Sequence, residues 1–215
     1  MSKTFNNQTF DDLVAYRDEV PLPPVVMKRF NWALELYKPK SILDFGCGTG
    51  RYSAHLVNDY AVYGIEPVKK AMAKARERGI LEWTGKPVDF VIMSEVIEHL
   101  ADPMKELRTI YNALKPNGIM FLTTPNAAWW KHRISLLFGK VSYVQGGGYT
   151  AATTPHIRLW TFKTLIDTLK QAGFTVFPAN KWGTYAGFKG GSFLMDCGLE
   201  TLLSAGIVVV AKRNG

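Results

Sequence analysis

The amino-acid sequence predicts an α/β protein with a doubly wound, mostly parallel sheet of seven strands and an inserted lid segment. Short apolar runs typical of buried strands alternate with helical segments of about ten residues, which is the pattern of βαβ units. Glycines follow the first of these runs, and other polar motifs also come directly after strands, where parallel sheets bind their ligands. The length of 215 residues and the 47% content of hydrophobic residues suffice for one well-buried core.

Each element has its own local signal. The seven strands are expected at residues 41–45, 61–65, 80–84, 88–93, 119–124, 174–177 and 207–211. The helices are expected at residues 24–39, 51–58, 68–78, 95–114 (with a proline break) and 161–172. Pro24 suits the first turn of a helix, and Thr161 suits the position before the last helix. Gly79 and Gly173 are typical of helix ends.

Composition narrows the setting of the protein. The net charge of +8 favours anionic partners such as nucleic acid, acidic lipid headgroups or phosphorylated metabolites, although it also serves solubility alone. The two cysteines, Cys47 and Cys197, form neither a disulfide framework nor a zinc pattern, which indicates a reducing, cytoplasmic location. Residues 1–20 lack the features of a signal peptide, and no apolar run is long enough to span a membrane. Nothing in the sequence indicates a particular oligomeric state.

A glycine-rich turn follows the first predicted strand and reads Asp44-Phe45-Gly46-Cys47-Gly48-Thr49-Gly50. Alternate glycines allow a sharp turn and a close approach of a ligand to the backbone, although a tight strand-to-helix turn explains them as well. The second strand ends at Glu66, whose two carboxylate oxygens match the vicinal hydroxyls of a ribose. Together these features predict a nucleoside site without choosing between adenosylmethionine and NAD.

Several motifs in order resemble those of class I S-adenosylmethionine-dependent methyltransferases. They are ILDFGCGTG, GIEP, VDFVIMSEVIEHLADP, LKPNGIMFLTTPN and HIRLWTFKTLIDTLKQAGF. They are most similar to the branch of quinone-biosynthesis O-methyltransferases and glycan-tailoring methyltransferases. The resemblance implies a Rossmann-like methyltransferase fold, S-adenosylmethionine as methyl donor, S-adenosylhomocysteine as product, and a small-molecule hydroxyl of a quinol precursor or glycan as acceptor. The cofactor-binding residues that we expect from it are Asp44, Gly46, Cys47, Gly48, Gly50, Tyr52, Glu66, Pro67, Trp83, Met93 and Ser94.

The sequence departs from this family after the third strand. The family usually has a Gly-Asp pair there, whose carboxylate binds the adenine amino group, whereas this chain runs from Trp83 through Gly85 almost directly into the fourth strand. Adenine is then expected to stack on Trp83 or to contact the backbone near Gly85. The lost acid also leaves open a degenerate, non-catalytic cofactor-binding module.

A cluster of acidic and histidine residues follows the fourth strand. Glu95, Glu98 and His99 share one face if this segment is helical, and His156 is a candidate fourth ligand of a divalent cation such as Mg²⁺. The cluster resembles the metal sites of small-RNA 2′-O-methyltransferases and of magnesium-dependent quinone O-methyltransferases, so metal-dependent RNA methylation is an alternative function. The other interpretations are a general base at His99 or His156, or local structural hydrogen bonds.

An aromatic and basic segment interrupts the α/β pattern. Its amphipathic part comprises Trp129, Trp130, Lys131, His132, Arg133, Ile134, Leu136, Leu137 and Phe138. It predicts a lid over an aromatic or lipid-like acceptor, a surface helix on an anionic membrane, or a cover that completes the core. Its basic residues are too few to favour nucleic acid. The single predicted domain thus comprises a lead-in and helix (1–40), a cofactor-binding core (41–124), the inserted lid (125–160) and a C-terminal helix and strands (161–215).

Overall fold

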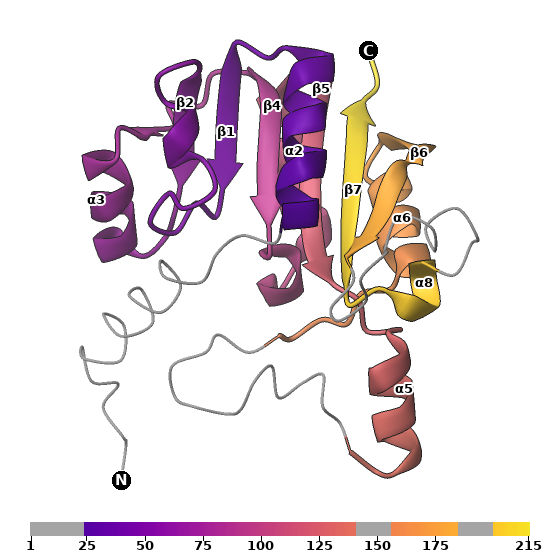
Figure 1. Ribbon diagram of the computed structural model, residues 1–215. Coiled ribbons are helices and arrows are strands. Elements are labelled where there is room, and N and C mark those ends of the chain that lie inside the picture. The colour runs from indigo at the N-terminus through magenta and orange to yellow at the C-terminus, as the bar shows by residue number, and fades with distance from the viewer. Residues whose placement is uncertain (1–23, 141–155, 185–199) are drawn as a thin grey trace, which may run out of the picture.

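The computed structural model describes residues 24–140, 156–184 and 200–215, and its centre is a seven-stranded sheet (Figure 1). The strands in chain order are β1 (Ser41–Phe45), β2 (Ala61–Ile65), β3 (Leu81–Glu82), β4 (Val88–Ser94), β5 (Leu114–Pro125), β6 (Phe174–Thr184) and β7 (Gly206–Arg213). Their order across the sheet is β3-β2-β1-β4-β5-β7-β6. The first five are parallel, and β7 runs antiparallel to both of its neighbours. The predicted mostly parallel, seven-stranded, Rossmann-like sheet is therefore confirmed.

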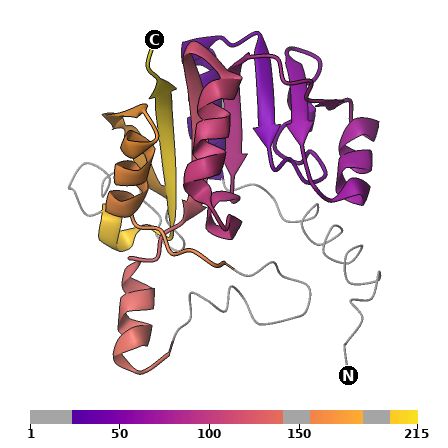
Figure 2. The same cartoon turned by 180° about the vertical axis from the view of Figure 1, so that it is seen from behind.

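Helices cover both faces of the sheet (Figures 1 and 2). The helical elements are α2 (Pro24–Tyr37), η1 (Ala54–Leu56), α3 (Lys69–Glu77), η2 (Ile97–His99), α4 (Pro103–Ala113), α5 (Trp130–Leu137), α6 (Phe162–Gln171) and α8 (Glu200–Leu203). Helix α2 packs on one face, where Phe30 contacts the rings of Phe90 and Phe121. Helices α4 and α6 cover the other face with residues such as Leu107 and Leu165.

Side-chain alternation along the strands assigns residues to one of these two faces. On β5, Phe121 belongs to the core beneath α2, whereas Leu122 belongs to the core beneath α4 and α6. The next two residues, Thr123 and Thr124, continue this alternation at the carboxyl end of the strand. They therefore point to opposite faces of the sheet, which separates two groups of polar side chains.

Two of the expected helices are wrong in extent. The segment 51–58 contains only the short 3-10 helix η1, since several of its turns close by bonds to the third preceding residue, such as Leu56 N to Ser53 O. The segment 95–114 is not one helix either. Glu95 has a left-handed backbone (φ 55°), η2 follows, and α4 starts anew at Pro103 with Asp102 as its N-cap.

The inserted segment is only partly described. Helix α5 has no buried residue and projects from the carboxyl edge of the parallel strands, at the bottom of Figure 1. The interpretation of this helix as a cover that completes the core is therefore wrong. The glycines at 146–148 and Cys197 lie outside the described residues. Among the described helices, none is long and apolar enough to cross a bilayer.

Candidate functional site

The glycine turn lies at the carboxyl end of β1, where it leaves the backbone exposed to a ligand. Gly46, Gly48 and Gly50 all have positive φ angles, of 79°, 54° and 84°. A Cβ atom on Gly46 would lie 2.6 Å from Val96 Cγ2, so that position is closed to any side chain. A Cβ atom on Gly48 would meet no atom within 4 Å. The turn thus packs tightly at its first glycine and is open at its second.

Glu66 is fixed beside this turn by two backbone donors. Its Oε2 accepts a hydrogen bond from Gly48 N at 3.0 Å, and its Oε1 accepts one from Val68 N at 2.9 Å. A carboxylate oxygen has capacity for a second donor, so both oxygens can still accept from the hydroxyls of a diol. The structure therefore brings Glu66 and the glycine turn together, as the sequence predicts.

Asp44 lies in the same group and is nearly inaccessible, with 3% of its surface exposed. Ser53 Oγ donates a hydrogen bond to its Oδ2 at 2.6 Å. Burial raises the pKa of Asp44 to about 7; the Ser53 hydrogen bond opposes this shift and the nearby Glu66 carboxylate adds to it. A buried acid that titrates near neutrality is typical of functional sites.

The structure gives less direct support for the other residues that were expected to bind the cofactor. The side chains of Cys47 and Met93 lie in the core, where burial raises the pKa of the Cys47 thiol to about 12, so only their backbones can face a ligand. Trp83 donates its indole N–H to Lys86 O at 2.9 Å, and its half-buried ring packs against the core beneath α4 and α6. Pro67 is exposed beside Glu66.

Ser94 belongs to a row of hydrogen-bonded side chains, with Tyr52 nearby. Burial raises the pKa of Tyr52, and its interaction with Ser94 opposes this shift. Ser94 Oγ lies 2.8 Å from Thr123 Oγ1, and Thr123 Oγ1 donates to Glu95 Oε1 at 2.9 Å. We call Ser94, Thr123 and Glu95 the hydroxyl chain. It lies on the α2 face of the sheet, as Asp44 does.

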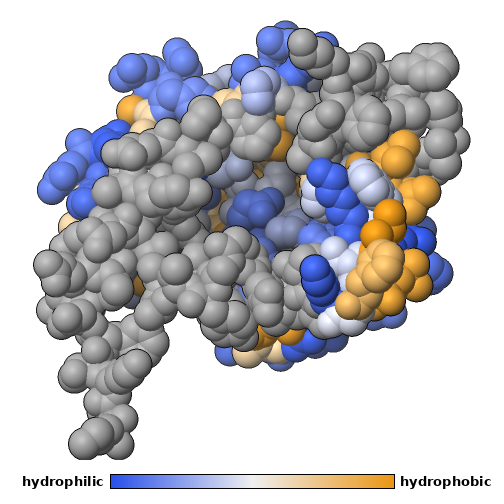
Figure 3. Space-filling model, turned by 60° about the horizontal axis from the view of Figure 1, so that its bottom comes forward, coloured by the Kyte–Doolittle hydropathy of each residue, from blue (hydrophilic) through white to orange (hydrophobic). Residues whose placement is uncertain are grey.

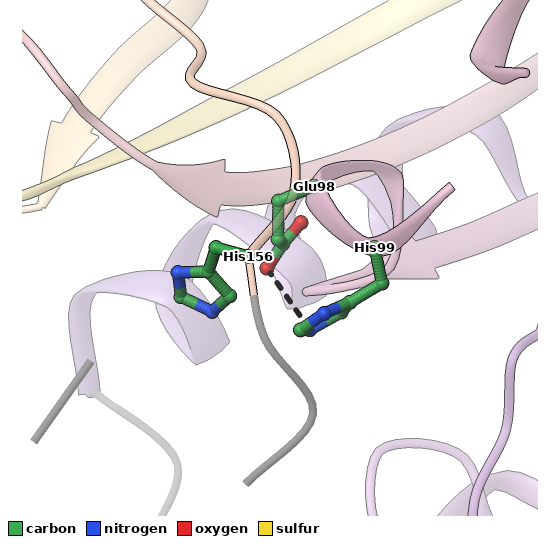
Figure 4. Close-up of side chains that lie close together, drawn as sticks. All are labelled: Glu98, His99 and His156. Atoms are coloured by element: carbon green, nitrogen blue, oxygen red, sulfur yellow. Dashed lines mark ion pairs between the residues drawn. The ribbon is translucent and has the colours of Figure 1, made fainter. Parts of the chain in front are cut away.

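A second polar group, the Glu98–His99–His156 cluster, lies on the other face, where Thr124 contacts Glu98. Figure 4 shows its three side chains close together. One ligand atom from each residue lies within 4.8 Å of the others. Glu98 is fully buried; its Oε2 accepts a hydrogen bond from Thr124 Oγ1 at 2.9 Å, and its Oε1 lies 3.9 Å from His99 Nε2. The two imidazole rings meet edge to face with their centroids 4.9 Å apart.

Glu95 does not join this cluster, contrary to the expectation from helical spacing. Because the segment is not an α-helix, the positions i, i+3 and i+4 do not share a face. Thr123 holds Glu95 and Thr124 holds Glu98, and these adjacent strand residues point to opposite sides of the sheet. The four-ligand arrangement is thus reduced to three candidate ligands among the described residues.

His156 reaches the cluster through backbone pairing that spans more than fifty residues of sequence. The amides of Ile157 and Arg158 both donate to Glu98 O, at 3.0 and 3.1 Å. The Arg158 guanidinium also donates to Leu100 O at 2.9 Å and to Ala101 O. These contacts hold the segment that carries His156 against η2. Sequence analysis did not identify Ser53, Thr123, Thr124 and Arg158 as site residues. Only the two adjacent threonines, at the end of a predicted strand, offered a sequence signal that could have pointed to them.

Figure 3 looks onto the edge that carries these groups. The view shows a hollow with hydrophilic residues inside it and hydrophobic residues gathered on one side. Among the exposed large hydrophobic residues of the described chain are Ile134, Leu136, Leu137 and Phe138 of the α5 region and Ile157 and Leu159. The polar groups of both sheet faces and this apolar surface thus share one edge of the molecule.

Comparison with known proteins identifies the family to which the chain belongs. A family model described as a methyltransferase domain matches residues 22–178. A ubiquinone biosynthesis O-methyltransferase of Caulobacter vibrioides is 38% identical over 103 residues, which cover 40% of this chain and 41% of that protein. One from Methylobacterium nodulans is 28% identical over 183 residues, covering 77% and 72%. The chain spans about half the length of the first such relatives that it matches.

Solved structures show the same fold. An S-adenosylmethionine-dependent methyltransferase from Clostridium acetobutylicum aligns with a TM-score of 0.64 and 14% identity, covering 97% of both chains. One from Thermotoga maritima aligns with a TM-score of 0.60 and 19% identity, covering 96% of this chain and all of that one. At such low identity the likeness establishes the fold alone.

Proposed function

The chain belongs to the class I S-adenosylmethionine-dependent methyltransferases, and from this premise we propose that it methylates a hydroxyl group of a small molecule such as a quinol precursor or a glycan. The observation that carries the donor half of this proposal is the placement of Glu66 beside the open glycine turn. Its carboxylate is held by Gly48 N and Val68 N with acceptor capacity left for a ribose diol. The acceptor class rests on similarity to the quinone O-methyltransferases.

The protein's chemical task in this reaction is mainly positional. The methyl group of a sulfonium is already electrophilic, so the site must align an acceptor oxygen with the S–CH3 bond and exclude water. Glu66 and the glycine turn hold the nucleoside, and Asp44 offers an anionic group next to them. The Glu98–His99–His156 cluster faces the same edge and handles the acceptor hydroxyl.

Two roles are open to this cluster, and we favour a divalent cation. Two imidazole nitrogens and one carboxylate oxygen within 4.8 Å fit a metal, and the two nitrogens suit Mn²⁺, Fe²⁺ or Zn²⁺ better than Mg²⁺. When bound, such an ion lowers the pKa of a coordinated hydroxyl. Thr124 orients the Glu98 carboxylate, and Arg158 holds the segment with His156. The second role is a metal-free general base at His99 or His156.

The donor half of the proposal is tested by replacing Glu66 with alanine. We expect the dissociation constant for S-adenosylmethionine to rise by about tenfold to a hundredfold, because the ribose hydroxyls lose charged acceptors worth about 1.5–3 kcal/mol. Isothermal titration calorimetry with S-adenosylmethionine and S-adenosylhomocysteine measures it. The matched control is Glu77→Ala, an exposed acid at the end of α3. Absence of binding by the unmodified protein would refute a methyltransferase function, and equal affinity of Glu66→Ala would refute the ribose contact.

We further propose that α5 contacts an anionic membrane surface. Ile134, Leu136, Leu137 and Phe138 are exposed, with 83% of Leu137 and 75% of Phe138 accessible. Basic residues accompany them: Lys131 lies over the rings of Trp129 and Trp130, and Arg133 and Lys140 are exposed. An apolar face with basic neighbours is typical of helices that lie in the interface of acidic bilayers. This contact would bring the hollow close to lipid-soluble acceptors.

Vesicle binding tests this contact. The double variant Leu137→Ser/Phe138→Ser is expected to bind phosphatidylglycerol-containing vesicles at least about tenfold more weakly, since two large apolar side chains no longer enter the interface. Co-sedimentation with these vesicles and with pure phosphatidylcholine vesicles measures the effect. Leu36→Ser on α2 is the control, as Leu36 is 55% exposed and lies on a different helix. Unchanged sedimentation of the double variant would rule out docking through α5.

A further inference from the structure

The glycine turn contacts the end of helix α3 as well as Glu66. A Cβ atom on Gly50 would overlap Ile80 Cδ1 and would lie 3.6 Å from Ala75 Cα, so the third glycine lets the turn approach this helix closely. Arg78 follows α3 as its C-cap, and Gly79 then turns the chain with a φ of 89°. The turn therefore packs against the last residues of α3 and the short connection to β3.

Arg78 holds Thr49, which lies between the second and third glycines of the turn. Its Nη1 donates to Thr49 O at 3.0 Å and to Thr49 Oγ1 at 3.2 Å. This nitrogen carries two hydrogens, so it can serve both acceptors at once, and the guanidinium is always charged. Thr49 itself is buried, with 8% of its surface exposed. One side chain from another element thus fixes both the carbonyl and the hydroxyl of Thr49.

These bonds determine how the peptide group after Thr49 is oriented. In a trans peptide group, the C=O and the N–H point in opposite directions. The C=O of this group points to Arg78, and its N–H, which belongs to Gly50, donates to Cys47 O at 2.8 Å. On the other side of Thr49, the amide of Gly48 donates to Glu66 Oε2. Arg78 and Glu66 therefore hold the two peptide groups that bound the Gly48-Thr49 pair.

A turn rich in glycine needs such contacts to keep one conformation. Glycine adopts positive and negative φ angles about equally well, so a glycine turn without them samples several backbone conformations. A ligand that binds only one of these conformations pays the entropy of ordering the backbone, and its affinity falls accordingly. The open side of the turn is at Gly48, where a Cβ atom would meet nothing within 4 Å. Arg78 acts from Thr49, one residue away.

We propose that Arg78 is a positioning residue of the donor site, which holds the glycine turn in its ligand-binding conformation through Thr49. The affinities for S-adenosylmethionine and for S-adenosylhomocysteine then depend on Arg78 to a similar extent, because the turn serves the parts that the two molecules share. This inference rests on the proposed function, since it requires a nucleoside at the turn. The other arginine near the end of α3, Arg76, bonds to Glu82 instead.

The test measures both affinities by calorimetry in Arg78→Met, which removes the donors and the charge at similar length. We expect both dissociation constants to rise by about threefold to tenfold, the range for a lost hydrogen bond of ordinary net strength. Loss of a cation acting through charge alone would instead strengthen binding of the positively charged donor. Arg78→Lys, which keeps a charged donor, should restore most of the affinity. Thr49→Val should also weaken both ligands, with little further effect in combination with Arg78→Met.

Arg76→Met is the matched control, because Arg76 lies on the same helix and is 56% exposed but bonds to Glu82 rather than to the turn. It should leave both affinities within twofold. Unchanged affinities in Arg78→Met, stronger binding of S-adenosylmethionine alone, or equal weakening in Arg76→Met would overturn the inference while the proposed function stands. Failure of the unmodified protein to bind either ligand would overturn both. Thermal unfolding of each variant verifies folding, and Thr49→Val decides the question if Arg78→Met is unstable.

Discussion

Replacing Asp44 by asparagine is expected to stabilise the protein at pH 8 by up to about 4 kcal/mol, the equivalent of the shift of its pKa from 3.8 to about 7. The folded state binds this proton more tightly than the unfolded state does. The unmodified protein should therefore lose stability as the pH rises from about 4 to about 7 and should level off above that range. The amide introduced by Asp44→Asn keeps an acceptor for Ser53 Oγ but has no charge to bury.

Urea unfolding of both proteins between pH 4 and pH 8 measures this effect. The difference in unfolding free energy should be small at pH 4 and should grow toward pH 8. Parallel pH dependences of the two proteins would show that Asp44 titrates normally. Because the Asp44 carboxylate lies close to Glu66 beside the glycine turn, we expect Asp44→Asn also to weaken binding of S-adenosylmethionine. Greater stability with lower affinity is the signature of a residue kept for function.

Glu98→Gln is expected to abolish cation binding by the Glu98–His99–His156 cluster, the second large effect. The substitution removes the only carboxylate among its three candidate ligands while keeping an oxygen that can accept from Thr124. The unmodified protein should show a higher melting temperature with millimolar Mn²⁺ or Zn²⁺, because a ligand of the native state stabilises it. The variant should show no such increase, and chelators should stop methyl transfer by the unmodified protein.

Glu95→Gln distinguishes the three-ligand cluster from the four-ligand site, including Glu95, that helical spacing predicts. Glu95 lies outside the cluster, so this variant should bind the cation as the unmodified protein does. A loss of cation binding in Glu95→Gln would mean that Glu95 is a ligand after all. If the unmodified protein shows no response to Mn²⁺ or Zn²⁺, and methyl transfer resists chelators, the metal-free base at His99 or His156 is the correct interpretation.

The two polar groups lie on opposite faces of the sheet. On the α2 face, Asp44 and the hydroxyl chain lie next to the glycine turn. On the face covered by α4 and α6, Thr124 orients Glu98 beside the two histidines. The division arises from one structural feature, the alternation of Thr123 and Thr124 at the end of β5.

The sequence by itself predicted the strands, most of the helices and the glycine turn beside Glu66. Apolar runs, glycines and prolines act within a few residues of themselves, so strands, helix starts and the turn at Gly46 could be predicted without the fold. The position of Glu66 could be predicted in the same way. Glu66 follows β2, which is parallel to β1, and the carboxyl ends of parallel strands lie at one edge of the sheet.

Only the tertiary structure decided which polar side chains meet. Helical spacing joined Glu95 to Glu98, but the left-handed backbone at Glu95 and the two threonines of β5 place them on opposite faces. His156 comes to the cluster through backbone bonds to Glu98. Such encounters depend on strand register and on which face a side chain takes, and a shift of one residue along a strand reverses that face.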